Sequence, residues 1–240
     1  MIDKIVCCMT SWRKRIKNVS KMVDLIKNQT LVPDNFYLTL SSDEFPSKND
    51  DLPKDLVDKI DDWFKINWVK ENSKTMKKVF PILQFLNPDD IIIYLDDDML
   101  KMPKDLLEKR IVEFSKYNKM CGITENGIDH LTINGKTSLY SSGCAGVVSK
   151  KMLNGWEKFM TPELFSDNQD DQAYTNILLL NGYIFRIPSY NKPGCFNAIN
   201  YIVPDNVALS LNRGYNILAG KILYANRVKQ VKNDWNTTTW

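Results

Sequence analysis

The sequence predicts an α/β fold in which a mixed, mostly parallel sheet carries helices on its faces. Runs rich in β-branched and aromatic residues alternate with amphipathic segments in the first half of the chain, which is the order expected when helices join parallel strands. Residues 91–95, with the sequence IIIYL, are apolar throughout, as in a strand buried on both faces. The length of 240 residues is sufficient for one domain with a full core.

The first half contains the clearest elements. β-branched and aromatic runs predict strands at 4–10, 36–40, 64–69 and 91–95. Apolar residues at helical spacing predict connecting helices at 19–26, 52–60 and 76–86. The resulting order, β-α-β-α-β-α-β, is typical of a sheet with parallel neighbours.

The second half has a less regular pattern. Helical spacing predicts helices at 106–117, from 150 onward and at 172–180. Short strands are predicted at 121–124, 147–148 and 183–187, with a loop or hairpin at 126–136. No linker, repeat or low-complexity stretch divides the chain, so we expect a single domain over residues 1–240.

Three consecutive carboxylates, Asp96, Asp97 and Asp98, follow the run at 91–95 directly. Such a cluster is costly unless a positive charge lies among its members. Alternate residues of an extended segment share a side, so we expect Asp96 and Asp98 to converge while Asp97 faces away. Mg²⁺ and Mn²⁺ prefer oxygen ligands, so the pair suits one of these ions carrying a diphosphate. The alternative is a solvated turn after a core strand.

Polar residues also follow the first two predicted strands, at 10–13 (TSWR) and 41–43 (SSD). Open parallel sheets bind ligands at the carboxyl ends of their strands. Together with Asp96, Asp97 and Asp98, these segments predict a nucleotide pocket at one edge of the sheet.

Composition excludes several other classes of protein. A net charge of +3 argues against nucleic acid as a partner. Five cysteines without a CxxC pair, and one histidine, argue against zinc and disulfide frameworks and favour reduced thiols. No apolar stretch approaches the ~20 residues that cross a bilayer, and the start does not resemble a secretory signal. We therefore expect a cytoplasmic protein.

In this order the motifs resemble nucleotide-sugar-dependent glycosyltransferases of the GT-A fold, especially small bacterial family 2-like enzymes that build surface polysaccharides. The resemblance spans about residues 4–190, although Trp12 stands where many of these enzymes have a smaller residue. The segments that resemble the family are its donor-binding first loop at 10–13, its lysine-and-proline helix at 74–83, its DxD signature at 96–98, its glycine-rich segment at 142–147 and its late acidic pair at 170–171.

The resemblance implies a Rossmann-like nucleotide-binding half at 1–100, an acceptor and catalytic half at 101–190 and a C-terminal extension at 191–240. It implies transfer of a sugar from a nucleoside-diphosphate sugar to a glycan or lipid-linked acceptor, with inversion. Asp98 and Asp96 would hold Mn²⁺ or Mg²⁺, and Asp97 would contact the ribose or the donor sugar.

Positive charge near the diphosphate would come from Arg13 and Lys78. Lys14 or Arg15 could take the place of Arg13, and Lys78 could equally belong to a solvated helix face. Thr10, Ser11 and Asp43 would hydrogen-bond the base, or would only cap strand ends and turns.

Gly143 would allow close approach of the backbone to a sugar, or would form a turn between strands. Inverting transfer needs a base for the proton of the acceptor hydroxyl, and Asp170 or Asp171 could serve. Either could instead be the N-cap of the helix that begins near residue 172. The resemblance favours Asp171 slightly as the base.

Residues 213–232 carry five basic side chains and no acid among apolar residues. This pattern is typical either of a helix that contacts anionic lipid on the inner face of a membrane or of a C-terminal helix docked on the core. Two other functions compete with glycosyl transfer. A nucleotidyltransferase would need a glycine-rich loop after the first strand, which is missing, and a non-catalytic glycan-binding protein would not need three clustered acids.

Overall fold

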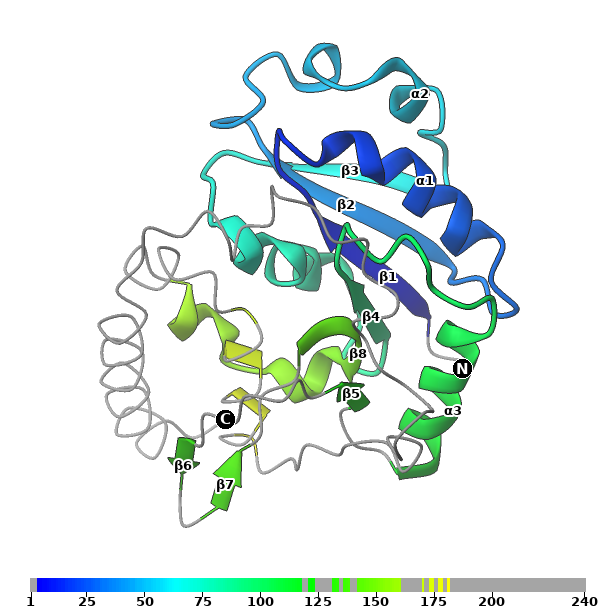
Figure 1. The fold of residues 1–240 in the computed structure, drawn as a ribbon. Coiled ribbons are helices and arrows are strands. Elements are labelled where there is room, and N and C mark those ends of the chain that lie inside the picture. Colours follow the sequence, from blue (N-terminus) through cyan, green and yellow to red (C-terminus); the bar gives the residue numbers. More distant parts are fainter. Residues whose placement is uncertain are drawn as a thin grey trace.

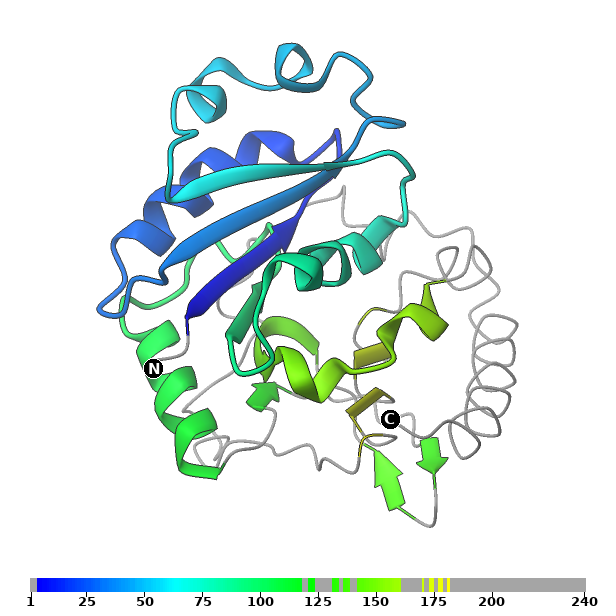
Figure 2. The same cartoon turned by 180° about the vertical axis from the view of Figure 1, so that it is seen from behind.

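A six-stranded sheet in the order β3-β2-β1-β4-β8-β5 forms the centre of the protein (Figures 1 and 2). The structure is a computed structural model, and it describes residues 4–117, 121–123, 131–133, 136–138, 142–160, 170, 173–174, 177–178 and 181.

Four parallel strands make up the larger part of this sheet. They are β1 (Ile5–Thr10), β2 (Asn35–Ser41), β3 (Phe64–Val69) and β4 (Ile91–Leu95). β1 pairs in parallel with β2 on one side and with β4 on the other, and β2 pairs in parallel with β3. All four strands lie within one residue of the predicted positions. Because they run in parallel, their carboxyl ends meet at one edge of the sheet.

Two antiparallel strands complete the sheet and make it mixed, as predicted. β8 (Ser142–Ser149) runs antiparallel to β4, and β5 (Cys121–Ile123) runs antiparallel to β8. The predicted strand at 147–148 is therefore one part of a longer strand. β6 (Leu131–Ile133) and β7 (Lys136–Ser138) form a separate antiparallel pair, which confirms a hairpin in the region predicted as loop or hairpin.

The contact between β4 and β8 requires a glycine. Gly146 pairs with Tyr94 across the two strands, and a Cβ atom at position 146 would lie 2.0 Å from Cζ of the Tyr94 ring. The Tyr94 ring packs in turn against Tyr174, with 4.9 Å between ring centroids. No side chain larger than hydrogen therefore fits at position 146.

Helices cover both faces of the parallel strands (Figures 1 and 2). α1 (Ile16–Lys27) lies on one face and buries the apolar stripe that predicted it, while the segment at 74–85 lies on the opposite face. α2 (Lys54–Val57), which follows the 3-10 helix η1 (Lys48–Asp51), is shorter than the helix predicted at 52–60. α3 (Leu106–Tyr117) has the predicted bounds.

The single helix predicted at 76–86 is wrong. The structure has two 3-10 helices there, η2 (Lys74–Lys78) and η3 (Phe80–Phe85). Pro81 explains the break, because its ring fixes φ and its nitrogen has no hydrogen to donate to the carbonyl group one turn earlier. The apolar side chains are nevertheless buried as their spacing indicated.

The helix predicted from residue 150 is also built from 3-10 turns, η4 (Lys150–Leu153) and η5 (Trp156–Phe159). Gly155 separates them with a φ of 77°, a left-handed conformation that ends η4 and favours glycine. Residues 170, 173–174 and 177–178 are helical, in agreement with a helix in this region. The strand predicted at 183–187 and the segments 191–240 and 213–232 lie outside the described residues.

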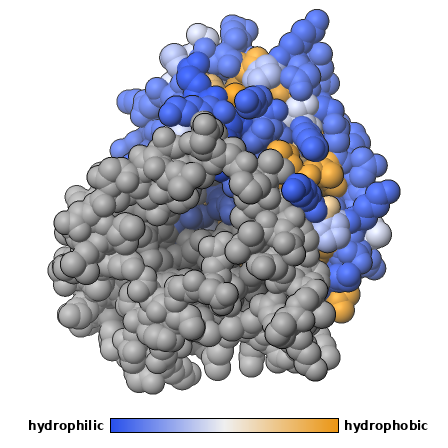
Figure 3. Space-filling view, in the orientation of Figure 1, coloured by the Kyte–Doolittle hydropathy of each residue, from blue (hydrophilic) through white to orange (hydrophobic). Residues whose placement is uncertain are grey.

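Hydrophilic side chains cover most of the described surface in Figure 3. Large apolar side chains that are exposed among the described residues are few, namely Val32, Phe85 and Val112. Within the same residues, no helix has both the length and the apolar character needed to span a bilayer.

Candidate functional site

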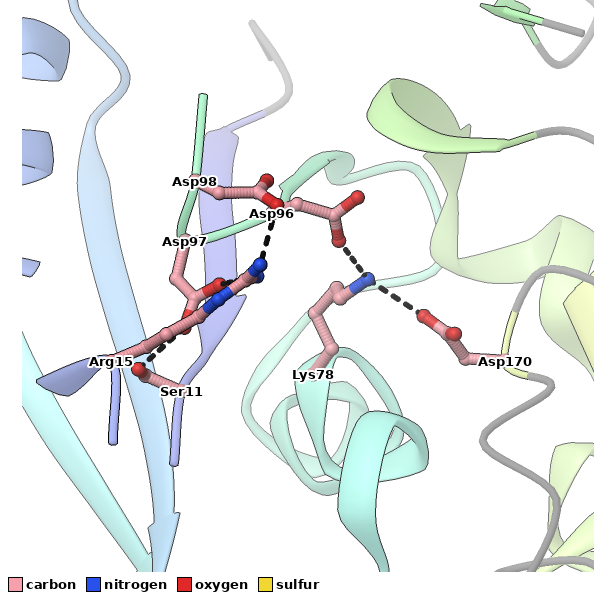
Figure 4. A network of polar contacts seen from close by, with 7 residues as sticks. All are labelled: Ser11, Arg15, Lys78, Asp96, Asp97, Asp98 and Asp170. Carbon is pink, nitrogen blue, oxygen red and sulfur yellow. Dashed lines mark hydrogen bonds and ion pairs between the residues drawn. The ribbon is translucent and has the colours of Figure 1, made fainter. Parts of the chain in front are cut away.

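The three consecutive carboxylates lie at the carboxyl end of β4, beside the loop that follows β1 (Figure 4). Asp97 and Asp98 are buried, and the side chain of Asp96 is 31% exposed. Burial of two of the three acids excludes the solvated turn that was the alternative interpretation. The three acids belong to a polar network with Ser11, Arg15, Lys78 and Asp170, which Figure 4 shows.

Asp97 contacts the loop after β1. The Ser11 hydroxyl donates a hydrogen bond of 2.6 Å to its Oδ2, and Nη1 of Arg15 donates one of 3.0 Å to its Oδ1. Burial raises the pKa of Asp97, while Ser11 and Arg15 oppose this effect. The side chain runs toward Ser11. The predicted alternation, with Asp97 facing away from Asp98, is wrong, because residues 97–98 form a turn and both carboxylates meet at Nη1 of Arg15.

Asp98 has one occupied and one open carboxylate oxygen. Nη1 of Arg15 lies 2.9 Å from Oδ2 of Asp98, whereas Oδ1 is buried and has no hydrogen-bond partner among the described residues. Burial and the charge of Asp96 raise the pKa of Asp98 to about 6, against the opposing effect of Arg15. A buried acceptor without a donor is costly in a folded protein, and either a cation or a bound water molecule would satisfy it.

Lys78 joins the acid cluster to a residue far along the chain. Its Nζ lies 2.7 Å from Oδ1 of Asp96 and 2.7 Å from Oδ2 of Asp170. Lys78 and Asp170 are both buried, so the solvated helix face considered for this lysine is excluded. Burial raises the pKa of Asp170, and the Lys78 charge opposes the rise. One of the two late acids therefore lies beside the three that follow β4.

The donor set fits a small divalent cation. Asp96 and Asp98 both have carboxylate oxygens that could bind a metal ion. Oδ1 of Asp98 has no hydrogen-bond partner among the described residues, so it is available as a metal ligand. Within the described ranges, no three Asp, Glu, His or Cys side chains are arranged so that together they could hold a metal ion. Mg²⁺ usually takes only one or two carboxylates and completes its shell with water and phosphate, so two acids suffice.

Arg13 and Arg15 differ sharply in position. Arg13 is exposed; its Nη2 donates to the carbonyl oxygen of Glu44 at 2.5 Å and lies 3.6 Å from Oδ2 of Asp51. Arg15 is buried and reaches the acid cluster. From the sequence we expected Arg13 to supply positive charge near the diphosphate, with Arg15 as an alternative. The structure places Arg15, and not Arg13, at the acids.

The other predicted residues lie near the same edge of the sheet. The Thr10 hydroxyl donates to the carbonyl oxygen of Thr39 at 2.8 Å, a contact that joins β1 to β2. Asp43 accepts a hydrogen bond of 3.3 Å from the backbone nitrogen of Asn72. Gly143 lies within β8 and not in a turn.

Lys77 is a buried lysine close enough to Asp97 to feel its charge, and the sequence did not predict its burial. It is buried, and its Nζ donates to Oδ1 of Asn72 at 2.9 Å and to the carbonyl oxygen of Lys74 at 3.0 Å. Burial lowers the pKa of Lys77 to about 8. No local pattern distinguishes Lys77 from its charged neighbours, so only the tertiary structure reveals its burial.

The late acidic pair is described in part. Asp170 is itself helical, so it does not serve as the N-cap of a helix beginning at 172. Asp171, the favoured base, lies outside the described residues.

Comparisons with known proteins show the fold. No protein-family model matches the chain, and no curated protein matches its sequence. A crystal structure of 4-diphosphocytidyl-2C-methyl-D-erythritol synthase is similar, with a TM-score of 0.56 and 10% identity over 85% of this chain and 94% of that chain. The synthase of the same name from Anaerococcus prevotii has a TM-score of 0.50 and 11% identity over 92% and 96%.

A third similar structure is S. aureus TarS 1-349 in complex with UDP, with a TM-score of 0.49 and 13% identity over 79% of this chain and 58% of that chain. At such identities the first two comparisons show a shared architecture. Together with the strand order and pairing, they confirm the predicted Rossmann-like α/β fold of the GT-A type.

Proposed function

We propose that the protein is a metal-dependent glycosyltransferase that moves a sugar from a nucleoside-diphosphate sugar to a glycan or lipid-linked acceptor, with inversion. One observation carries the proposal: Asp98 presents a buried, open carboxylate oxygen next to Asp96, at the edge where open parallel sheets bind their ligands. The shared fold with a diphosphocytidyl-erythritol synthase supports a transferase that binds a nucleotide.

Asp96 and Asp98 would hold Mn²⁺ or Mg²⁺. When bound, such an ion stabilises the negative charge that develops on a departing diphosphate. Arg15 keeps the Asp97 and Asp98 carboxylates in place, and Lys78 does the same for Asp96. Arg15 also opposes the rise that burial causes in the pKa of Asp97 and Asp98, so these two carboxylates ionise more readily than they would without it.

In the proposed reaction the acceptor hydroxyl oxygen forms a bond to the anomeric carbon of the donor sugar. The bond between that carbon and the diphosphate oxygen breaks, its electron pair leaves with the nucleoside diphosphate, and the hydroxyl proton passes to a base. Asp170 is buried and paired with Lys78, which makes it a positioning residue in this proposal. Asp171 remains the proposed base.

A nucleotidyltransferase is the second candidate, because the fold is shared with a synthase whose name refers to a diphosphocytidyl product. The loop after β1 favours glycosyl transfer over this candidate. Residues 11–15 contain no glycine and include the buried Arg15, whereas a phosphate-cradling loop needs small residues whose backbone N–H groups face the ligand. Contact of residues 213–232 with a membrane that carries the acceptor is a further part of the proposal.

The test begins with a thermal-shift screen of nucleoside diphosphates and their sugars in the presence of Mn²⁺, since a ligand of the folded state raises the melting temperature. The donor identified in this way is then used in assays of sugar hydrolysis and transfer. Asp98→Ala should abolish both reactions without lowering the melting temperature. Asp62→Ala is the matched control, because Asp62 is exposed just before β3, at the opposite edge of the sheet.

Undiminished turnover by Asp98→Ala would refute the metal assignment. Incorporation of a nucleoside monophosphate into product, with release of pyrophosphate, would establish the nucleotidyltransferase instead.

A further inference from the structure

Arg15 contacts two carboxylates through a single nitrogen. Its Nη1 lies 3.0 Å from Oδ1 of Asp97 and 2.9 Å from Oδ2 of Asp98, and the arginine side chain is only 9% exposed. The second oxygen of Asp98, Oδ1, is buried without a partner among the described residues. One oxygen of Asp98 is therefore occupied by the protein and the other is open.

We infer that Arg15 is a positioning residue that makes Asp98 a monodentate ligand and thereby selects small six-coordinate cations over calcium. This inference rests on the proposed function, because it concerns the metal that the proposed reaction uses. It adds a residue to that site and a property, the choice of ion, that the three acids alone do not determine.

The coordination preferences of the ions connect this geometry to selectivity. Mg²⁺ requires near-ideal octahedral geometry with oxygens at about 2.0–2.1 Å and is bound through one or two carboxylates, whereas Ca²⁺ takes six to eight oxygens at about 2.3–2.6 Å and often uses both oxygens of a carboxylate. Oδ2 of Asp98 accepts from the Arg15 guanidinium, whose positive charge repels a metal ion on that side, so chelation through both oxygens is disfavoured. The site therefore lacks the extra ligand that calcium would gain.

The neighbouring acids are also engaged with protein groups. Asp97 uses Oδ2 to accept from Ser11 and Oδ1 to accept from Arg15, so both of its oxygens are engaged. Asp96 uses Oδ1 to accept from Lys78. Each of the two proposed metal ligands therefore has one oxygen bonded to a cationic side chain.

The backbone holds Arg15 in this position. Its N–H donates to the carbonyl oxygen of Trp12 at 2.8 Å, in the turn that leads into α1. Because both this turn and the guanidinium are fixed by several contacts, Arg15 is well placed to fix the orientation of Asp98. Groups that orient metal ligands in this way typically change metal affinity about 10–100-fold when they are removed.

The experiment measures Mn²⁺ binding to the full chain by electron paramagnetic resonance in the presence of UDP, with Ca²⁺ as the competing ion. Arg15→Met removes the donor while keeping an apolar stem. Lys17→Met, an exposed position on α1, is the control for loss of one positive charge. The readout is the ratio of the Ca²⁺ to the Mn²⁺ dissociation constant, because a lost positive charge strengthens the binding of both ions alike and cancels in the ratio.

We expect Arg15→Met to lower this ratio by about tenfold or more and Lys17→Met to leave it unchanged. A ratio in Arg15→Met equal to that of the wild type, with Mn²⁺ still bound, would overturn the inference and leave the proposed function standing. Failure of the wild-type protein to bind Mn²⁺ with UDP would overturn both.

A second measurement covers the case in which Arg15→Met does not fold. In a crystal structure of the wild-type protein with Mn²⁺ and UDP, Asp98 should bind the ion through Oδ1 alone while Oδ2 stays on Nη1 of Arg15. Chelation of Mn²⁺ by both oxygens of Asp98 would overturn the inference.

Discussion

Replacement of Asp98 by asparagine is expected to stabilise the metal-free protein at neutral and alkaline pH. The pKa of Asp98 is raised from its ordinary value of 3.8 to about 6, first by burial and then by the charge of Asp96. An acid whose pKa is higher in the folded state destabilises the fold when it is ionised. This cost is fully present above the folded-state pKa and disappears as the pH falls toward the unfolded-state value. Asparagine has the same shape and no charge, so it avoids the cost.

The magnitude follows from the pKa of Asp98. The difference between 3.8 and about 6 corresponds to about 3 kcal/mol, at about 1.4 kcal/mol for each tenfold change. Little of this is lost to solvent screening, because the Asp98 side chain is only 12% exposed. The attraction of Arg15 is already contained in the raised pKa. Asp98→Asn should therefore be about 2–3 kcal/mol more stable than the wild type at pH 8 and about equally stable near pH 4.

The assay is urea unfolding in EDTA at several pH values between 4 and 8, with Asp62→Asn as the control for loss of an exposed charge. Two results would refute the reasoning: a variant that is less stable than the wild type at pH 8, or a difference between them that stays constant as the pH falls. Addition of Mn²⁺ with UDP should reverse the order, because a ligand that binds only the wild-type site stabilises only the wild type.

Two further predictions concern the close contact between β4 and β8 and the buried ion pair between Lys78 and Asp170. In urea unfolding, Gly146→Ala should lose about 3 kcal/mol of unfolding free energy, because the new Cβ would lie 2.0 Å from Cζ of Tyr94. The double variant with Tyr94→Leu should recover part of this loss. Equal stability of Gly146→Ala and the wild type would contradict the prediction. Lys78→Met should lose about 3–5 kcal/mol, because it leaves the buried Asp170 carboxylate without its cation. Asp170→Asn in the Lys78→Met background should restore most of this stability, and a double variant no better than the single one would count against the argument.

The parallel strands were predictable because each is a short apolar or alternating run. Burial on both faces leaves no polar residue in the run at 91–95, and this signal does not depend on the rest of the chain. The 3-10 helices at 74–85 were missed because the spacing of their apolar residues also fits an α-helix. Pro81 lies in the middle of that segment and was the available signal for a break.

The position of the candidate site and the presence of Lys78 there were predictable, whereas Arg15 was considered only as an alternative to Arg13. Acids at the end of a buried strand lie at the edge where open parallel sheets generally bind their ligands. Which of Arg13 and Arg15 faces those acids depends on the turn at 12–15, whose backbone hydrogen bonds direct Arg15 inward. Lys78 finds its partner Asp170 at a separation of 92 residues, which no local pattern indicates.

The most direct test of the proposed nucleotide and metal site is calorimetry of UDP binding in Mn²⁺ and in EDTA, for the wild type and Asp98→Asn. We expect the wild type to bind UDP about tenfold more tightly or better in Mn²⁺, and Asp98→Asn to lose this difference. UDP binding by the wild type that is absent, or equal in Mn²⁺ and in EDTA, would contradict the proposal.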